Sequence, residues 1–301
     1  NNYFKLQFIS KMKISGFTFV RNAVKYDYPI VEAITSILPI CEEMIVLIGN
    51  SDDNTTELIQ NIKSDKIKIV YSVWDDSLRE GGKVLAVETN KAFQEIQPKA
   101  DWAFYIQADE VVHEKYHQNI LEACEAYVSD KNVDGLLFKY KHFYGSYDYI
   151  GASNRWYKNE IRIIRNNKNI YSFKDAQGFR KDDNQKLNVK PIDAYIYHYG
   201  WVKHPEKMKN KVNNFHSYWH KGDELEKRLV KSDTFDYSEI DSLQKFTETH
   251  PKVMQERIKQ KNWTFDYDIS YNKANLKDKI KNISKKILGR EIGEYRNYKI
   301  I

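Results

Sequence analysis

Four apolar runs in the first third of the chain alternate with segments of helical pattern. The runs are rich in β-branched and aromatic residues, which predicts buried strands at Lys13–Val20, Glu43–Ile48, Ile67–Val73 and Trp102–Ile106. Helical patterns occupy residues 29–38, 52–62 and 83–97. Three strand–helix units followed by a fourth strand predict a parallel, doubly wound sheet with right-handed crossovers.

The second half of the chain departs from this alternation. Strands are predicted at Gly135–Tyr144, Glu160–Arg165 and Tyr195–Tyr199, with aromatic, glycine-containing loops at 145–147 and 175–178 between them. From about His204 the pattern becomes helical, and Pro205 suits a first turn.

We therefore expect an α/β protein in two parts. Residues 12–203 are predicted to form a domain whose mostly parallel, Rossmann-like sheet is flanked by helices. Residues 204–301 are predicted to form a C-terminal helical extension packed on or beside it. Met12 is interpreted as the natural start of the protein, with residues 1–11 as an extension.

The composition is that of a globular protein, with 41% hydrophobic and 30% charged residues. No apolar run approaches the roughly 18–20 residues that cross a bilayer, and the first ten residues lack the features of a signal peptide. Cys41 and Cys124 lie far apart in apolar surroundings, which predicts buried free thiols. These features predict a cytoplasmic protein.

The formal net charge of +6 is concentrated near the C-terminus. Residues 272–301 hold nine of the 48 Lys and Arg residues and three of the 42 Asp and Glu residues, which leaves 39 of each sign in residues 1–271. A neutral body argues against a nucleic-acid-binding groove. Residues 275–288 place apolar side chains at helical spacing among lysines. This pattern predicts either a peripheral contact with an anionic membrane or a helix docked on the body by its apolar stripe.

Two carboxylates directly follow the fourth predicted strand. They are Asp109 and Glu110, and the polar segment beyond them is predicted to be a helix. Open α/β sheets bind ligands in a crevice at the carboxyl ends of their strands, which makes this pair a candidate site. An aspartate that caps the following helix is the alternative.

Short polar motifs follow the predicted strands in a recognisable order. Arg21-Asn22 follows the first strand, Ser51–Thr55 the second, and Gln107–Glu110 the fourth. This order resembles the family-2 glycosyltransferases with the GT-A fold, which have Arg-Asn, Ser-Thr-Asp-Gly-Thr and Asp-x-Asp at these places. The resemblance extends to a bacterial and viral subgroup through residues 175–181 (DAQGFRK), 198–202 (HYGWV), 250–251 (HP) and 293–298 (GEYRNY), so it spans nearly the whole chain from Met12.

The chain departs from that family at two places. Gln107 stands where the first Asp of Asp-x-Asp is found, which leaves Asp109 to contact a metal directly. The acidic residue that often ends the second strand is replaced near Ile48-Gly49-Asn50. The identity of the nucleotide and the affinity for a metal therefore stay open.

The resemblance implies a metal-assisted reaction on a nucleotide sugar. A divalent cation on the phosphate oxygens acts as a Lewis acid for the leaving diphosphate, and Mn²⁺ or Mg²⁺ takes oxygen ligands for that purpose. Asp109 is the predicted ligand. His198 is a second predicted ligand, because enzymes of this fold frequently place a late histidine on the metal or the diphosphate; a histidine satisfied within the core is the alternative. Glu110 is predicted either to contact the acceptor or orient Asp109, or to form a structural salt bridge.

Asp175 is the predicted catalytic base. Inverting enzymes place a carboxylate near the acceptor hydroxyl, and Asp175 lies where this fold builds its acceptor side. A turn-forming aspartate is the alternative. Arg180 and Lys181 are predicted either to hold an anionic acceptor or phosphate, or to be exposed charges.

The nucleotide is expected to contact Arg21, Asn22 and Asp53, which follow the first two strands. For Asp53 the alternative is that it complements the dipole of the helix it opens. Gly82 and Lys83 open a further helix, whose free N–H groups and ammonium suit a pyrophosphate.

The resemblance and these residues together predict a metal-assisted, inverting glycosyltransferase that moves a sugar from a nucleotide-sugar donor to a hydroxyl of a glycan or lipid-linked acceptor. Aromatic residues crowd the region 140–157, and aromatic planes suit the apolar faces of sugar rings, although most Trp and Tyr belong to cores. The alternative is a degenerate relative that binds a nucleotide sugar or glycan without turnover, which Gln107 favours.

Overall fold

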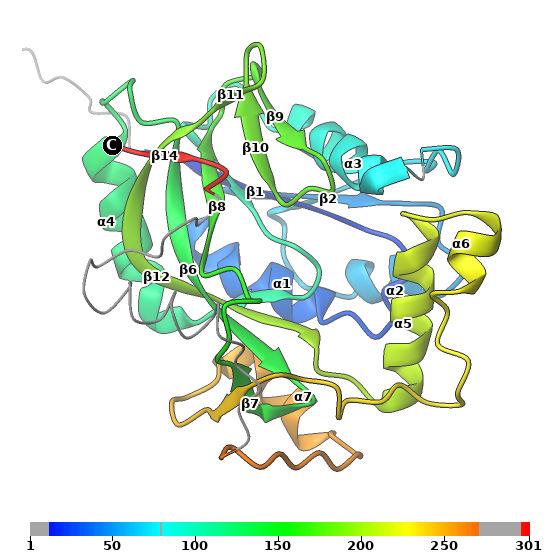
Figure 1. Cartoon of the computed structure of the whole chain (residues 1–301). Helices are drawn as coiled ribbons and strands as arrows, with labels where there is room; N and C mark the ends of the chain where they lie inside the picture. Colours follow the sequence, from blue (N-terminus) through cyan, green and yellow to red (C-terminus); the bar gives the residue numbers. More distant parts are fainter. Residues whose placement is uncertain (1–11, 79, 271–295) are drawn as a thin grey trace, which may run out of the picture.

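The computed structural model describes residues 12–78, 80–270 and 296–301, and its centre is a large curled sheet with helices on both faces (Figure 1). The main path of the sheet has the order β13-β7-β6-β8-β4-β1-β2-β3, and β12 joins it through β6 and also pairs with β5 and β14. Its strands are β1 (Ile14–Val20), β2 (Glu43–Ile48), β3 (Ile67–Tyr71), β4 (Trp102–Tyr105), β5 (Glu110–Val112), β6 (Gly135–Tyr144), β7 (Ser146–Gly151), β8 (Asn159–Arg165), β12 (Asn188–Trp201), β13 (Leu243–Lys245) and β14 (Lys299–Ile300).

Helices and a small second sheet surround this centre. The helices are α1 (Ile30–Ile37), α2 (Thr55–Gln60), α3 (Lys83–Gln94), α4 (His117–Tyr127), α5 (Pro205–Ser217), α6 (Gly222–Glu226) and α7 (Gln255–Lys259), with 3-10 turns at Leu38–Ile40, Glu80–Gly82, Glu114–Tyr116 and Lys252–Met254. The second sheet consists of β9 (Ile170–Phe173), β10 (Gly178–Lys181) and β11 (Gln185–Lys186).

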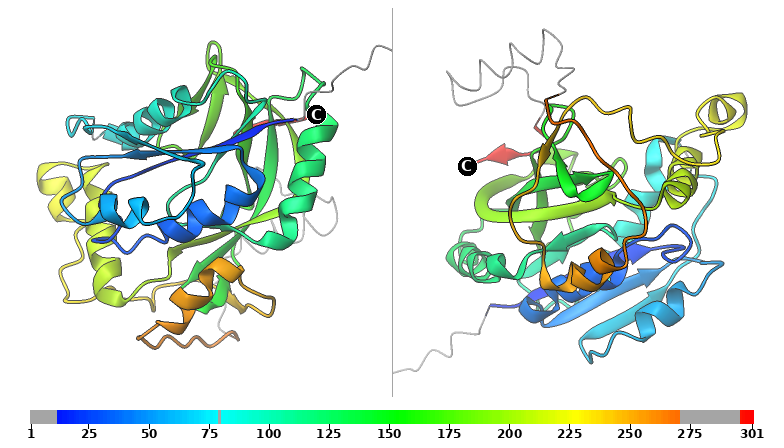
Figure 2. Two further views of the ribbon diagram at one scale, coloured as in Figure 1. Left: turned by 180° about the vertical axis from the view of Figure 1, so that it is seen from behind. Right: turned by 90° about the horizontal axis from the view of Figure 1, so that it is seen from below.

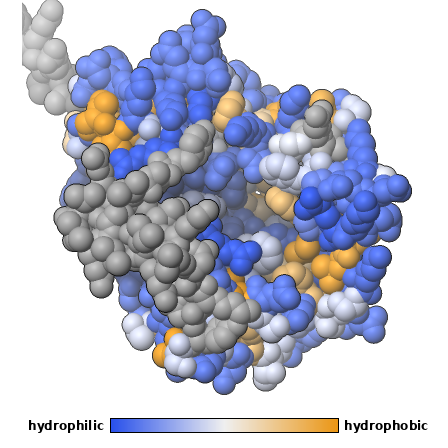
Figure 3. Space-filling view, in the orientation of Figure 1, coloured by the Kyte–Doolittle hydropathy of each residue, from blue (hydrophilic) through white to orange (hydrophobic). Residues whose placement is uncertain are grey.

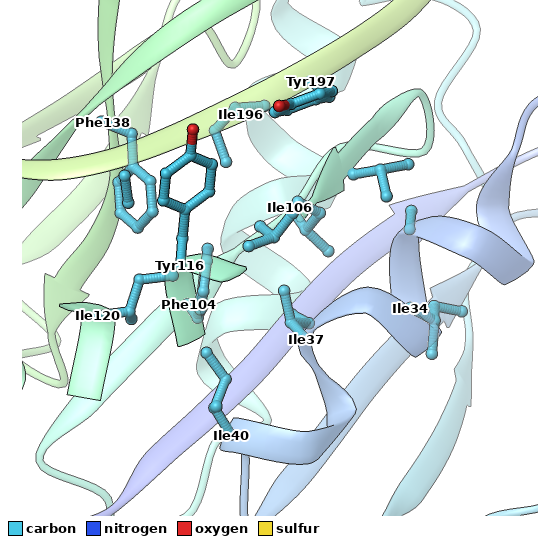
Figure 4. Close-up of a cluster of buried hydrophobic side chains, with 14 of the residues drawn as sticks. Ile34, Ile37, Ile40, Phe104, Ile106, Tyr116, Ile120, Phe138, Ile196 and Tyr197 are labelled. Atoms are coloured by element: carbon cyan, nitrogen blue, oxygen red, sulfur yellow. The ribbon is translucent and has the colours of Figure 1, made fainter. Parts of the chain in front are cut away.

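The first half of the chain forms a parallel four-stranded block in the order β3, β2, β1, β4. Successive side chains of a strand point to opposite faces, and in β2 Val46 packs in one core while Leu47 packs in the other. Helices α1 and α4 cover the first face and α3 covers the second (Figure 2). Figure 4 shows part of the first core, to which α1 contributes Ile34 and Ile37 and β4 contributes Phe104. Coverage on both faces explains the continuous apolar runs.

The second half of the sheet is built mainly on β6 and β12. Strand β8 runs antiparallel to both β4 and β6, and β12 runs parallel to β6. The predicted strand at Tyr195–Tyr199 thus lies in the second half of a 14-residue strand. The expected α/β class, with a mostly one-directional sheet flanked by helices, is confirmed.

The helix predicted in the polar segment beyond Asp109 and Glu110 is present, but a short strand precedes it. Glu110–Val112 is the short strand β5, which pairs antiparallel with β12, and α4 begins at His117. Val111 and Val112 are buried in the core. These two β-branched residues favour an extended backbone beside β12. Hydrogen bonds to β12 and packing in the core outweigh the weak helical pattern of the polar residues that follow.

The predicted loop at 145–147 is also shorter than expected. Gly145 forms the turn with a positive φ of 70°, and β7 starts at Ser146 and returns along β6. A Cβ on Gly145 would lie 2.5 Å from the ring of Phe265, so both the backbone conformation and the packing require glycine here.

The described residues after 203 form strands as well as helices. Helix α5 begins at Pro205 as expected, and Nδ1 of His204 accepts a hydrogen bond from the N–H of Glu206 at 3.4 Å. Beyond α5 the described segments contain short helices together with β13, which pairs with β7, and β14, which pairs with β12. The division of the chain at residue 203 stays a prediction.

Two other expectations concern the thiols and membrane insertion. Cys41 and Cys124 are free and buried, as predicted. Among the described helices, none has the length and apolar character to cross a bilayer. The predicted helix at 275–288 and the predicted extension at residues 1–11 lie outside the described residues.

Candidate functional site

A pocket of about 410 Å³ opens between the carboxyl ends of β1 and β4, the turn that joins β9 to β10, and helix α5. Figure 3 shows that this face of the molecule is hollowed near its centre. The predicted site residues that line the pocket are Arg21, Asp109, Asp175 and His198. The aromatic residues Tyr157 and Trp201 also line it, as do Arg162 and Lys211, which are not among the predicted site residues.

Asp109 reaches the pocket because β4 ends in a turn that is tied to β12. The N–H of Tyr199 in β12 donates to the Asp109 carbonyl at 2.8 Å. Asp109 is 9% exposed, and its Oδ2 accepts a hydrogen bond from Nζ of Lys211 at 3.0 Å. Burial would raise the pKa of Asp109, but the charge of Lys211, together with that of His198 when its ring is protonated, outweighs burial and holds the pKa well below its usual range. The side chain is therefore a carboxylate at neutral pH.

Lys211 comes from the middle of α5, about a hundred residues later in the sequence. Besides Asp109 it donates to the carbonyl of Gly200 at 2.7 Å, and its Nζ lies 5.4 Å from the ring centroid of Tyr28, which also lines the pocket. Lys203 lies nearby with no exposed surface, and its Nζ donates to the carbonyl of Asp27. Burial lowers the pKa of Lys203 to about 7. Of these two lysines, it is Lys211 that lines the pocket and brings a positive charge to its α5 side.

His198 faces Asp109 from β12. Its Nε2 lies 3.7 Å from Oδ1 of Asp109, which is too long for a hydrogen bond. Burial lowers the pKa of His198 to about 4, so the ring is neutral at pH 7. No group of three or more His, Cys, Asp or Glu side chains within the described parts of the chain is placed to hold a metal ion.

Glu110 points away from the pocket, into the core. Its two oxygens accept from Nε and Nη2 of Arg162 at 2.8 and 2.7 Å, and the hydroxyl of Tyr140 donates to it at 2.7 Å. Glu110 and Arg162 are 0% and 1% exposed as side chains. This is the salt-bridge alternative considered for Glu110: the carboxylate is occupied, and it is Arg162 that lines the pocket.

Asp175 sits in the turn that joins β9 to β10. The two flanking residues, Lys174 and Ala176, have positive φ angles of 57° and 63°. Burial raises the pKa of Asp175, which makes its carboxylate a stronger base. Gln107 braces this turn, because its Nε2 donates to the carbonyl of Ala176 at 3.3 Å.

Gly82 approaches the same turn from the start of α3. A Cβ on Gly82 would lie 2.8 Å from Cβ of Asp175, and the residue has a positive φ of 69°. The next residue, Lys83, is exposed. Neither lines the pocket, so Gly82 supports Asp175 rather than opening an anion site there.

The predicted nucleotide contacts after β1 and β2 mainly hold two loops together. Oδ1 of Asn22 accepts from the N–H of Asp52 at 2.8 Å, and Oδ2 of Asp53 accepts from the N–H of Lys25 at 2.7 Å. Both side chains are outside the pocket lining, whereas Arg21 lines it. Nη1 of Arg21 forms an ion pair with Asp76 at 3.1 Å.

Two further predicted cations are structural. Arg180 is buried and donates to the carbonyl of Asn297 at 3.0 Å, and Nζ of Lys181 pairs with Asp134 at 2.8 Å. Of the predicted aromatic cluster, Tyr157 and Trp201 reach the pocket. Others, such as Phe143, pack in the core.

Glu160 of β8 is a buried acid, and it lies close enough to Asp175 for the charge of Asp175 to raise its pKa. It is 4% exposed, and within the described residues its Oε2 has no hydrogen-bond partner. Burial raises its pKa from 4.5 to about 8, and the nearby Glu110 and Asp175 charges also raise it. Glu160 is therefore mostly protonated at pH 7.

A buried acid of this kind makes stability depend on pH. Because the folded-state pKa is raised, its contribution is complete below the unfolded-state pKa and is lost as pH rises through the folded-state pKa. Between pH 4.5 and 8.5 we expect Glu160→Gln to gain stability relative to the wild type by roughly 3–5 kcal/mol. Urea unfolding of both proteins across this range measures the difference, and parallel pH curves would contradict it.

The residues that sequence reasoning missed come from distant elements. Arg162 stands within the apolar run EIRIIR, and a charged residue in a buried strand is a detectable sign of a paired or functional group. Lys211 lies in a lysine-rich helix where nothing distinguishes it from its neighbours. Only the docking of α5 beside β12 brings it to Asp109.

The sequence matches no protein-family model and no curated protein. Solved structures that resemble the chain include S. aureus TarS, with 17% identity and a TM-score of 0.40 over 68% of this chain and 39% of that one. S. aureus TarS 1–349 in complex with UDP gives 15% identity and a TM-score of 0.38, over 69% and 65% of the two chains. Mannosyl-3-phosphoglycerate synthase from Rubrobacter xylanophilus gives 16% identity and a TM-score of 0.30, over 48% and 43%. The chain spans less than two thirds of each, and likenesses of this degree assign no activity to it.

Proposed function

We propose that the protein is a nucleotide-sugar-dependent glycosyltransferase with a GT-A-like fold, which transfers a sugar to a hydroxyl of a glycan or lipid-linked acceptor. The observation that supports this proposal most is that cationic side chains and a carboxylate line the same pocket. Arg21, Arg162 and Lys211 offer positive charge to a diphosphate, and Asp175 offers a carboxylate from the facing turn. The pocket lies at the carboxyl ends of parallel strands, where open α/β sheets bind ligands.

The transfer breaks the bond between the anomeric carbon and the diphosphate oxygen. The leaving diphosphate takes the electron pair, and cations in a site sheltered from water stabilise the developing charge. Arg162 is held for this role by the two hydrogen bonds that it donates to Glu110, which fix the plane of its guanidinium.

The acceptor hydroxyl supplies the new bond to the anomeric carbon and loses its proton. Asp175 is the proposed base, and its raised pKa favours uptake of that proton. The sugar ring is proposed to lie against Tyr157 and Trp201, which line the pocket and present aromatic planes to its C–H faces.

The proposed metal would be held by Asp109 and His198. These side chains supply a carboxylate oxygen and an imidazole nitrogen 3.7 Å apart on the pocket wall, and such cations often use one or two protein ligands together with substrate phosphates. When bound, the ion would add Lewis-acid stabilisation of the diphosphate. Lys211 already neutralises part of the Asp109 charge, so we expect a weak metal site in the absence of nucleotide.

Release of nucleotide from a panel of UDP-, GDP-, dTDP- and CMP-sugars tests the proposal. With Mn²⁺ or Mg²⁺ we expect one donor class to be hydrolysed, at least about tenfold faster than in EDTA, because the cation offsets charge on the leaving group. Binding of a nucleotide sugar without release, even with a range of glycan acceptors, would instead support the binding-protein alternative. Absence of both binding and release would contradict the proposal.

A further inference from the structure

A second histidine lies directly behind His198. His142 of β6 is the register partner of His198 in β12, and it is 3% exposed. The Nδ1 atoms of the two rings are 3.2 Å apart, and Nε2 of His142 is 2.8 Å from the carbonyl oxygen of Tyr157. His142 does not line the pocket itself, but it contacts two residues that do, His198 and Tyr157.

The pattern of donors and acceptors determines which nitrogens carry protons. A carbonyl oxygen only accepts, so Nε2 of His142 must be the protonated nitrogen. A neutral imidazole has one N–H, and both rings are buried with no carboxylate at hydrogen-bonding distance among the described residues, so burial favours the neutral form of each. Nδ1 of His142 is therefore an acceptor. The short contact between the two rings then requires the proton to be on Nδ1 of His198.

We propose that His142 is a positioning residue, which holds His198 in the tautomer protonated at Nδ1 and so turns an unprotonated Nε2 toward Asp109 and the pocket. The assignment of the tautomer does not depend on the proposed function. The role of the Nε2 lone pair in the reaction does rest on the proposed function. Unprotonated Nε2 of His198 can bind a metal ion or accept a proton from a ligand, but it cannot donate a hydrogen bond.

The contacts around Asp109 agree with this assignment. A histidine beside a carboxylate ordinarily donates its N–H to it, yet Nε2 of His198 stays 3.7 Å from Oδ1. The carboxylate instead receives its hydrogen bond from Lys211. Asp109 thus has a hydrogen-bond donor without a proton from His198. A lone pair on Oδ1 of Asp109 and the lone pair on Nε2 of His198 then face each other across the place where a cation would bind.

Aromatic packing keeps the ring of His142 in the orientation needed to position His198. Its ring is stacked on Trp156 with centroids 5.1 Å apart and meets Tyr157 edge-on at 4.3 Å. Turning the ring over would move Nε2 away from the Tyr157 carbonyl and leave a buried carbonyl without its donor, which typically costs about 1–3 kcal/mol.

Nitrogen-15 NMR of histidine-labelled protein in the absence of ligand tests the inference. Two-bond nitrogen–proton correlations distinguish the two neutral tautomers, and a His198→Gln spectrum assigns the His198 signals. At neutral pH we expect wild-type His198 to be protonated at Nδ1. Protonation at Nε2 would overturn the inference, whatever the activity of the protein.

Two substitutions at His142 separate positioning from simple packing. His142→Phe keeps an aromatic ring but removes the acceptor, so His198 is expected to shift to the Nε2-protonated form. The amide oxygen of asparagine lies where Nδ1 of histidine does, so His142→Asn is expected to restore the Nδ1-protonated form. An unchanged tautomer in His142→Phe would overturn the role of His142.

Turnover of the donor identified by the panel provides the functional readout. We expect kcat to fall about 10–100-fold in His142→Phe and to recover partly in His142→Asn, as for other residues that orient a ligand-binding histidine. If the tautomers behave as expected but no donor is turned over, the proposed function is contradicted while the positioning of His198 by His142 is supported. Full activity of His142→Phe with a shifted His198 tautomer would show that the positioning of His198 by His142 has no role in catalysis.

Discussion

Replacing Glu110 by glutamine is expected to lower the free energy of unfolding by about 3–5 kcal/mol, the usual result of breaking one side of a buried ion pair. Arg162 is 1% exposed as a side chain, so it cannot exchange its lost partner for water. Tyr140 also loses a charged acceptor for its hydroxyl. The cost arises because a charge is left uncompensated in a medium of low polarity.

Urea denaturation of the wild type, Glu110→Gln and the double variant Glu110→Gln/Arg162→Met measures this effect. Removing both charges is expected to recover most of the stability, since well-packed apolar residues often replace a buried pair without loss. Glu224→Gln is the matched control, because its pair with Arg228 is exposed and i,i+4. Its loss should be below about 0.5 kcal/mol. A change of less than about 1 kcal/mol in Glu110→Gln would contradict the prediction.

Asp109→Asn is expected to reduce kcat for donor turnover on the order of 10³-fold, because it removes a group that stabilises charge in the proposed transition state. The substitution keeps the shape of the side chain but removes the charge that holds Lys211 at 3.0 Å. It also removes an anionic ligand from the proposed metal site. The initial rate of nucleotide release, with the donor identified by the panel, measures the effect.

Asp53→Asn provides the matched control for this prediction. Asp53 belongs to another of the motifs after the strands, but its oxygens accept N–H bonds from Lys25 and Thr55 outside the pocket. We expect its kcat to change less than about threefold, with the effect appearing in stability instead. Asp109→Asn with near-normal kcat would contradict the assignment of Asp109, and equal losses in both variants would contradict the division between pocket and loop.

Local pattern was sufficient to predict the parallel block. Strands β1 to β4 are covered on both faces, so each is a continuous apolar run that stands out in the sequence. The carboxyl ends of parallel strands meet at one edge of a sheet, and this places Arg21 and Asp109 in one pocket. The resemblance added Asp175 and His198, which no local pattern distinguishes.

In the second half of the sheet the sequence predicted β6, β8 and part of β12, but neither β5 nor the pairing of these strands. Glu110–Val112 is extended because β5 pairs with β12, which in turn pairs with β6. Pairings over such separations depend on which strand lies opposite, and a short window of sequence contains no record of that partner.

The amino-acid sequence by itself determined the α/β class, the parallel strands and the edge of the sheet where a ligand site would form, because these follow from hydrophobic period and chain direction. Only the tertiary structure decided what surrounds each group. It turned Glu110 toward Arg162, brought Lys211 to Asp109 and placed His142 behind His198. The charge and proton state of a side chain depend on neighbours that are distant in the sequence, so the folded chain had to define them.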